Sequence, residues 1–261
     1  MLTVTCVDDQ IRIHVEATRR PLMSLDQCAL YELAKDNENG ARFRRAFASR
    51  GDLLLSSINM FELGQLQGQS LERAKRFLDE VIGHAWTPIE FDSIDVIKRE
   101  LAGQTSPSPY ISPSLVDLTC ATPGLPTLSK LLEAARHSSA DKAARDSARL
   151  ELGRQIEALR KSLNPKPSPL RMYSIPNCKT LSVALSLFHM ILQQGRGPSS
   201  FQWALNDAED FTHSIVGLAH ADVVVLDGKW ANRVRSLSQA KVFSCGEIPA
   251  FIEWCEAAAL R

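Results

Sequence analysis

Residues 222–227 read Asp222-Val-Val-Val-Leu-Asp227, and residues 52–57 read Asp52-Leu-Leu-Leu-Ser-Ser. Each is a short, continuous apolar run between polar residues, which is typical of a strand buried on both faces of a sheet. Working outward from these runs, segments of strand character alternate with segments that have helical spacing. This alternation predicts an α/β fold: a parallel sheet flanked by helices.

The positions of these segments predict how the chain is organised. Alternating apolar residues between 3 and 17 predict a short N-terminal β-hairpin. The strand-helix rhythm stops at about 103, where Pro, Gly and Ser accumulate, and it resumes near 200. We expect residues 103–126 to form a loop or linker and 127–163 a helical hairpin. We further expect residues 103–170 to form a separate helical lobe that gives no strand to the sheet. The expected divisions are the hairpin at 1–19, an α/β domain at 20–102 and 196–261, and a mainly helical insertion at 103–195.

Composition excludes several classes of protein. The chain has 261 residues, 44% of them hydrophobic, with 30 basic and 30 acidic side chains. This apolar content excludes general disorder, and zero net charge excludes a strongly basic nucleic-acid binder. Every long apolar run is interrupted by charge, and the first residues lack the features of a secretory signal. We therefore expect a cytoplasmic protein that does not enter a membrane.

The cysteines follow no metal-binding or disulfide pattern. The six are scattered along the chain without a Cys-x-x-Cys pair, so the sequence predicts no zinc site. We expect most of them to be reduced core residues.

Several carboxylates occupy positions that are unusual for carboxylates. Asp26 follows an apolar strand and precedes a helix, and Asp227 ends the strand at 223–226. Glu62 shares a helical face with apolar side chains, and Asp207 and Asp210 lie three residues apart at a helix start. The carboxyl ends of parallel strands face one crevice, so these acids could meet there. Read one at a time, they could equally be helix caps, first-turn acids or an ordinary turn.

The segments around these acids resemble those of the PIN (PilT N-terminus) domain nucleases. The matching stretches are Leu22-Met-Ser-Leu-Asp-Gln-Cys-Ala-Leu, Ser57-Ile-Asn-Met-Phe-Glu-Leu, Asn206-Asp-Ala-Glu-Asp-Phe-Thr-His and Ala221-Asp-Val-Val-Val-Leu-Asp-Gly-Lys. The resemblance covers about 20–102 and 200–245. It implies a PIN-like fold in which an acidic quartet holds Mg²⁺ or Mn²⁺ and catalyses RNA hydrolysis. The implied quartet is Asp26, Glu62, Asp210 and Asp227, with Asp207 sharing the metal-binding role of Asp210.

The chemistry of these residue types agrees with that implication. Mg²⁺ prefers carboxylate oxygen and water, and a carboxylate site can activate a water while neutralising a phosphodiester's charge. Like charges about 5 Å apart repel by roughly 3 kcal/mol at an effective dielectric of about 20. We therefore expect one carboxylate to have a raised pKa, and we assign it to Glu62 because its neighbours are apolar. For the RNA, Arg42, Arg45 and Lys229 are candidate contacts.

The leading hypothesis is a metal-dependent endoribonuclease. By resemblance to many prokaryotic PIN proteins, it would act as a toxin or defence effector, with a homodimer or an inhibitory protein as candidate partners. Leu226 and Gly228 depart from the family pattern, which usually has Thr and a second Asp there. These departures favour the alternative of a catalytically silent PIN-like module that binds RNA or a protein partner. A third reading is an unrelated α/β protein whose acids cap helices.

Overall fold

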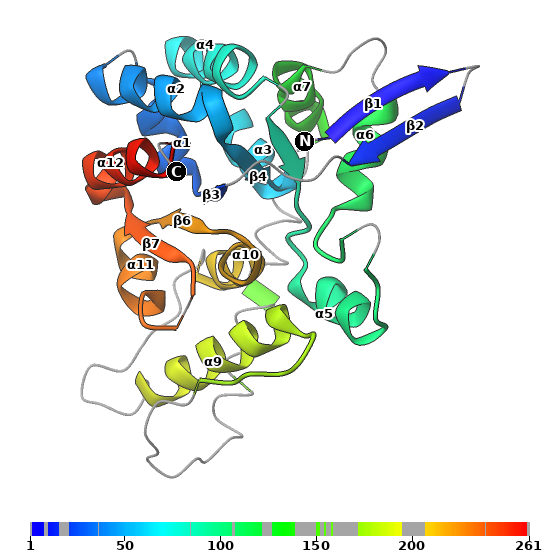
Figure 1. Ribbon diagram of the computed structural model, residues 1–261, viewed down its shortest axis with the longest axis vertical. Coiled ribbons are helices and arrows are strands. Elements are labelled where there is room, and N and C mark those ends of the chain that lie inside the picture. Colours follow the sequence, from blue (N-terminus) through cyan, green and yellow to red (C-terminus); the bar gives the residue numbers. More distant parts are fainter. Residues whose placement is uncertain are drawn as a thin grey trace.

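A computed structural model of the chain describes residues 2–7, 10–15, 21–35, 37–83, 85–105, 108–121, 127–138, 150–151, 154, 158, 172–194, 207–237 and 239–259. The expected hairpin is present as β1 (Leu2–Val7) paired antiparallel with β2 (Gln10–Val15). The main sheet has five parallel strands in the order β5-β4-β3-β6-β7 (Figure 1). The α/β prediction is confirmed. The strands are β3 (Leu22–Leu25), β4 (Asp52–Leu55), β5 (Trp86–Pro88), β6 (Val223–Leu226) and β7 (Lys241–Ser244).

Helices cover both faces of this sheet. Alternate strand residues such as Leu25 and Val225 pack into one hydrophobic core, and Leu22 and Val224 pack into the other. The first core is covered by α1 (Gln27–Ala34), α2 (Glu38–Arg50), α3 (Ser57–Gly64), α4 (Gly68–Phe77) and α12 (Ile248–Ala259). The second is covered by α5 (Ser93–Leu101), α9 (Lys179–Gln194), α10 (Asp207–His220) and α11 (Gly228–Val234).

Helix α10 lies unusually close to the central strand β3. A Cβ placed on Gly217 would meet the hydroxyl oxygen of Ser24 at 2.6 Å, so the helix approaches this closely only because residue 217 has no side chain. This contact fixes the position of α10, which carries Asp210 and His213 toward the edge of the sheet.

Two expectations for the middle of the chain are wrong. The segment expected to be a loop contains α6 (Pro113–Ala121), which follows Ser112; the Ser112 hydroxyl accepts a hydrogen bond from the Leu115 N–H at 3.4 Å. Proline suits the first position of a helix, where no N–H is needed, so Pro113 starts this helix instead of breaking one. Helix α7 (Leu128–Ser138) does not form part of a separate lobe, because Leu128, Leu131 and Leu132 are buried in the main core.

The remaining expectations for the helical insertion are only partly tested. Most of residues 139–171 lie outside the described part of the chain, so the second half of the expected helical hairpin does too. Within the described ranges, residues 127–163 contribute no strand to the sheet.

None of the described helices combines the length and apolar character that a bilayer crossing requires.

The buried carboxylate of Glu100 connects three helices on one face of the sheet: α5, α9 and α10. Glu100, at the end of α5, is only 6% exposed and accepts hydrogen bonds from the backbone N–H and hydroxyl of Thr180 at 2.9–3.2 Å. Its oxygen also lies 3.2 Å from Nε2 of His220. Burial alone would raise the pKa of Glu100, but the hydrogen bonds from His220 and Thr180 outweigh it and lower the pKa.

We predict that Glu100→Gln lowers the free energy of unfolding at pH 7 by about 1–3 kcal/mol, because Thr180 and His220 lose a charged acceptor. A carboxylate with a lowered pKa contributes stability that is present above about pH 4.3 and is lost as the pH falls through the folded-state pKa. The variant should therefore lose less stability than wild type in that acid range. Urea unfolding at several pH values measures both effects, with the exposed Glu80→Gln as the control. Equal loss in the two variants at pH 7 would contradict the assignment.

Candidate metal centre

Asp26 lies where β3 ends and α1 begins. Its backbone N–H donates to the Val225 carbonyl oxygen at 2.9 Å, so the parallel pairing of β3 with β6 continues up to this residue. Its side chain accepts a hydrogen bond from the Gln27 N–H at 2.7 Å, which makes Asp26 the N-cap of α1. The carboxylate is consequently held at the carboxyl edge of the sheet.

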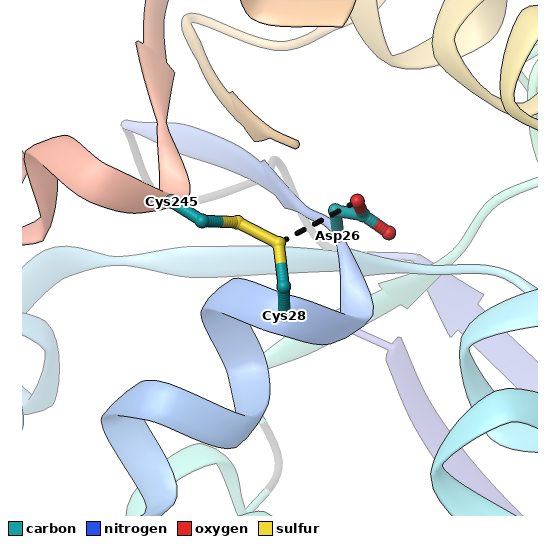
Figure 2. A group of neighbouring side chains, drawn as sticks. All are labelled: Asp26, Cys28 and Cys245. Atoms are coloured by element: carbon teal, nitrogen blue, oxygen red, sulfur yellow. Dashed lines mark hydrogen bonds between the residues drawn. A yellow bond between two sulfur atoms is a disulfide. The ribbon is translucent and has the colours of Figure 1, made fainter. Parts of the chain in front are cut away.

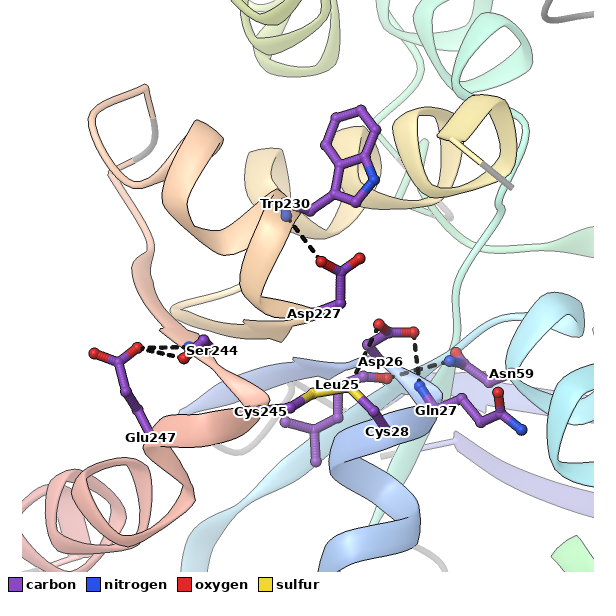
Figure 3. Close-up of a disulfide and its surroundings, with 10 residues drawn as sticks. All are labelled: Leu25, Asp26, Gln27, Cys28, Asn59, Asp227, Trp230, Ser244, Cys245 and Glu247. Atoms are coloured by element: carbon purple, nitrogen blue, oxygen red, sulfur yellow. Dashed lines mark hydrogen bonds between the residues drawn. A yellow bond between two sulfur atoms is a disulfide. The ribbon is translucent and has the colours of Figure 1, made fainter. Parts of the chain in front are cut away.

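Asp227 occupies the corresponding position on the neighbouring strand. It follows β6 and caps α11 by accepting a hydrogen bond from the Trp230 N–H at 3.0 Å. Because β3 and β6 are adjacent and parallel, their carboxyl ends lie side by side, and Figure 3 shows Asp26 and Asp227 at this shared edge. The sequence pattern predicted this juxtaposition.

Asp210 reaches the same place from α10. Its Oδ2 accepts a hydrogen bond from the indole N–H of Trp230 at 3.1 Å. Asp26, Asp210 and Asp227 line one small cavity of about 10 Å³, which they share with His213, Leu226 and Trp230. A cavity of roughly 10–15 Å³ holds about one water molecule, so the space suits a single water or ion.

His213 of α10, which was not among the predicted site residues, also lines this cavity. Nε2 of His213 lies 3.1 Å from the hydroxyl of Ser56, the N-cap of α3. The side-chain amide of Asn59, on the first turn of the same helix, donates to the Leu25 carbonyl oxygen at 3.2 Å. Ser56 and Asn59 are fully buried, so α3 supports both His213 and the end of β3. Only the spacing of His213, one turn after Asp210, could have indicated this role.

The electrostatics single out Asp26. Burial raises its pKa, and repulsion from Asp227 raises it further. Attraction to His213 and the backbone N–H groups of Gln27 and Asp227 act in the opposite direction, but the pKa remains raised. The structure thus places a raised pKa at Asp26, and the raised pKa that we expect for Glu62 stays a prediction.

The two other predicted ligands are placed differently. The carbonyl oxygen of Glu62 accepts a hydrogen bond from the Gln27 side chain at 2.9 Å, so its backbone lies next to the residue that follows Asp26. The Glu62 side chain is not among the described residues that line the cavity. Helix α10 begins at Asp207 as expected, but the side chain of Asp207 lies outside the described residues. The structure thus brings together three of the five predicted acids.

A disulfide that the sequence did not predict borders the cavity. Cys28 on α1 is bonded to Cys245, which follows β7, across 217 positions of sequence. Figure 2 shows this pair beside Asp26, whose Oδ2 lies 3.6 Å from the Cys28 sulfur. A disulfide sulfur carries no hydrogen, so this approach is a contact and not a hydrogen bond. The expectation of reduced cysteines is wrong for this pair, while Cys178 and Cys255 are free and buried.

The predicted RNA contacts are distributed over distant elements. Arg42 on α2 forms two hydrogen bonds with Glu256 on α12, at 3.0 and 2.7 Å, so a carboxylate already neutralises its charge. Arg45 is exposed on the same helix. Lys229 is exposed on the first turn of α11, two residues after Asp227, and is the predicted contact nearest in sequence to a cavity residue.

In comparisons with protein-family models, with curated proteins and with solved structures, no match to this chain was found. Membership of the PIN domain nucleases therefore stays a prediction from the quoted sequence segments. The site has to be judged on its own geometry and charge.

We predict that Asp26→Asn melts higher than wild type at pH 7 without metal, by roughly 2–4 °C for each 1 kcal/mol gained. A carboxylate with a raised pKa destabilises the folded state once the pH exceeds that pKa, and asparagine removes the charge but keeps the capping oxygen. The control is Asp92→Asn, which changes the exposed N-cap of α5. It should melt at or slightly below wild type. If both variants melt below wild type, Asp26 is only a cap.

Proposed function

We propose that this chain is an endoribonuclease that depends on Mg²⁺ or Mn²⁺ and hydrolyses RNA phosphodiester bonds. The observation that supports this most is the convergence of Asp26, Asp210 and Asp227 from three separate elements on one ion-sized cavity. Like charges repel, so a bound cation would stabilise three such groups around one small space.

The donor set fits a hard cation. All three side chains offer carboxylate oxygen, which Mg²⁺ and Mn²⁺ prefer, and all three are half-buried. The raised pKa of Asp26 agrees, because a cation would offset the two effects that raise it, first burial and then repulsion from Asp227. In the proposed site these three residues hold the metal, and Asp207 and Glu62 remain predicted ligands.

When bound, the metal supplies an activated water and neutralises charge on the phosphodiester. The surrounding residues would orient the reactants. His213 lines the cavity beside the three acids, and Ser56 fixes its ring through Nε2. Trp230 orients Asp210, and Lys229 would bind a backbone phosphate next to the site.

The assignment of RNA as substrate comes from the resemblance to PIN nucleases and from the position of Lys229. Arg42 is no longer part of this proposal, because Glu256 already pairs with it. We keep Arg45 only as a candidate contact to the RNA backbone, at a distance from the cavity. The toxin or defence role, the homodimer or inhibitory partner and the cytoplasmic location remain predictions from the same resemblance and composition.

A second candidate, a catalytically silent module that binds RNA or a protein partner, is favoured by one specific observation. Every carboxylate in the cavity already accepts a hydrogen bond from the protein: Asp26 from Gln27, Asp227 from the Trp230 backbone and Asp210 from the Trp230 indole. Acids with these structural roles need no metal to explain their positions. The two candidates therefore differ in whether a divalent ion binds.

We predict that wild type cleaves mixed-sequence RNA in Mg²⁺ or Mn²⁺ and that excess EDTA abolishes cleavage. Asp210→Asn should lower the rate by about 100-fold or more, since changes even to residues that only support metal ligands cost 10–100-fold. Asp92→Asn should cleave as wild type does. Cleavage that persists in EDTA would contradict metal dependence. RNA binding without cleavage, and without a Mn²⁺-induced rise in melting temperature, would establish the silent module instead.

A further inference from the structure

Two cysteines and an aspartate, far apart in sequence, form a compact group at the edge of the sheet. One ligand atom from each of Asp26, Cys28 and Cys245 can be chosen so that all three lie within 4.8 Å of one another. All three residues are half-buried, which leaves the group accessible to a small ion. They come from three elements: the β3–α1 junction, the first turn of α1, and the 3₁₀ turn Cys245–Glu247 that follows β7.

We propose that reduction of the Cys28–Cys245 disulfide creates a binding site for a thiophilic divalent cation, Zn²⁺, held by the two thiolates and the Asp26 carboxylate. Two sulfur ligands and one carboxylate make a soft, mixed donor set that favours Zn²⁺ over Mg²⁺. Three protein ligands leave one tetrahedral position for water, as in open zinc sites.

The dimensions agree with this assignment. With Zn–S bonds of about 2.3 Å, two sulfurs on a tetrahedral ion lie roughly 3.7 Å apart. The Cα atoms of Cys28 and Cys245 are separated by 6.3 Å, so rotation of the side chains after the S–S bond breaks can provide that spacing. The Cys28 sulfur already lies 3.6 Å from Oδ2 of Asp26, the separation expected of two ligands on one zinc ion.

Cys28 lies in the first turn of α1 and is half-buried beside Asp26. The free thiol of Cys255 differs, because it is buried in the main core, where burial raises its pKa to about 12. Cys255 therefore provides a matched cysteine that should not bind metal.

The chemistry balances with a dithiol as the reductant. The dithiol gives up two electrons and two protons and becomes a disulfide, the Cys28–Cys245 bond breaks, and each sulfur becomes a thiol. Zn²⁺ then displaces the two thiol protons into solvent. In the oxidised protein the sulfurs are bonded to each other, and Asp26 remains with the oxygen ligands Asp210 and Asp227.

The redox state would then decide which metal Asp26 binds. This consequence rests on the proposed function, because it requires that the three carboxylates bind Mg²⁺ or Mn²⁺. The zinc site itself does not require it, since neither Asp210 nor Asp227 is among its ligands.

The test uses Co²⁺ as a spectroscopic substitute for Zn²⁺ in the full chain. The protein is reduced under argon with a phosphine, which takes oxygen from water to form its oxide while both water hydrogens pass to the sulfurs. The phosphine is then removed and Co²⁺ is added. We expect a sulfur-to-cobalt charge-transfer band at one equivalent, which excess Zn²⁺ abolishes, and no band in protein left oxidised.

Variants then locate the site. Cys28→Ser and Cys245→Ser should each lose most of the band, and Asp26→Asn should weaken Co²⁺ binding by at least about 10-fold. Cys255→Ser should keep it. A reduced wild type without the band, or a band that survives both Cys28→Ser and Cys245→Ser, overturns the proposal. The comparison of oxidised with reduced wild type tests the site even if a serine variant fails to fold. Asp210→Asn should keep the band, so a protein that cleaves no RNA can still confirm this site.

Discussion

The parallel pairing of β3 with β6 is the constraint on which the rest of the structure depends. The register that joins Leu25 to Val225 brings both strands to an end at the same edge, where Asp26 and Asp227 follow them. The two residues could be separated only by breaking the pairing of β3 with β6. Helix α10 must then approach β3 at Gly217, and this close packing delivers Asp210 and His213 to the same edge. The clustering of like charges at this edge is thus a direct consequence of the topology.

Two kinds of interaction can stabilise these clustered carboxylates: hydrogen bonds from the protein and a bound cation. Hydrogen bonds from Gln27 and Trp230 stabilise the carboxylates locally, as N-caps do in many proteins that bind no metal. The pKa of Asp26 nevertheless stays raised, first by burial and then by repulsion from the Asp227 carboxylate, although His213 and the backbone N–H groups of Gln27 and Asp227 lower it. A bound cation would stabilise the charged form of Asp26 against both effects, and three acids from separate elements meet at one cavity, so we prefer the metal site to simple capping.

Much of this arrangement could be predicted from the sequence because it depends on short-range patterns. Apolar runs that end in an acid, such as Val223–Leu226 before Asp227, indicate both the strand and the edge at which it ends. Long-range pairings leave no such pattern: the Cys28–Cys245 bond and the Arg42–Glu256 ion pair each join segments more than 200 residues apart. Pro113 was misread for a local reason, since proline both starts and interrupts helices. The role of His213 depends on Ser56, which only the fold brings near.

The central claim is that Asp26, Asp210 and Asp227 together bind one divalent cation, and a crystal grown with Mn²⁺ from the oxidised protein tests it most directly. Diffraction data collected at the manganese absorption edge would show where the ion lies. We expect a single anomalous peak within coordination distance of all three carboxylates, about 2.0–2.3 Å from their oxygens. A cavity that holds only water at saturating Mn²⁺, with the three acids still in their capping hydrogen bonds, would contradict it.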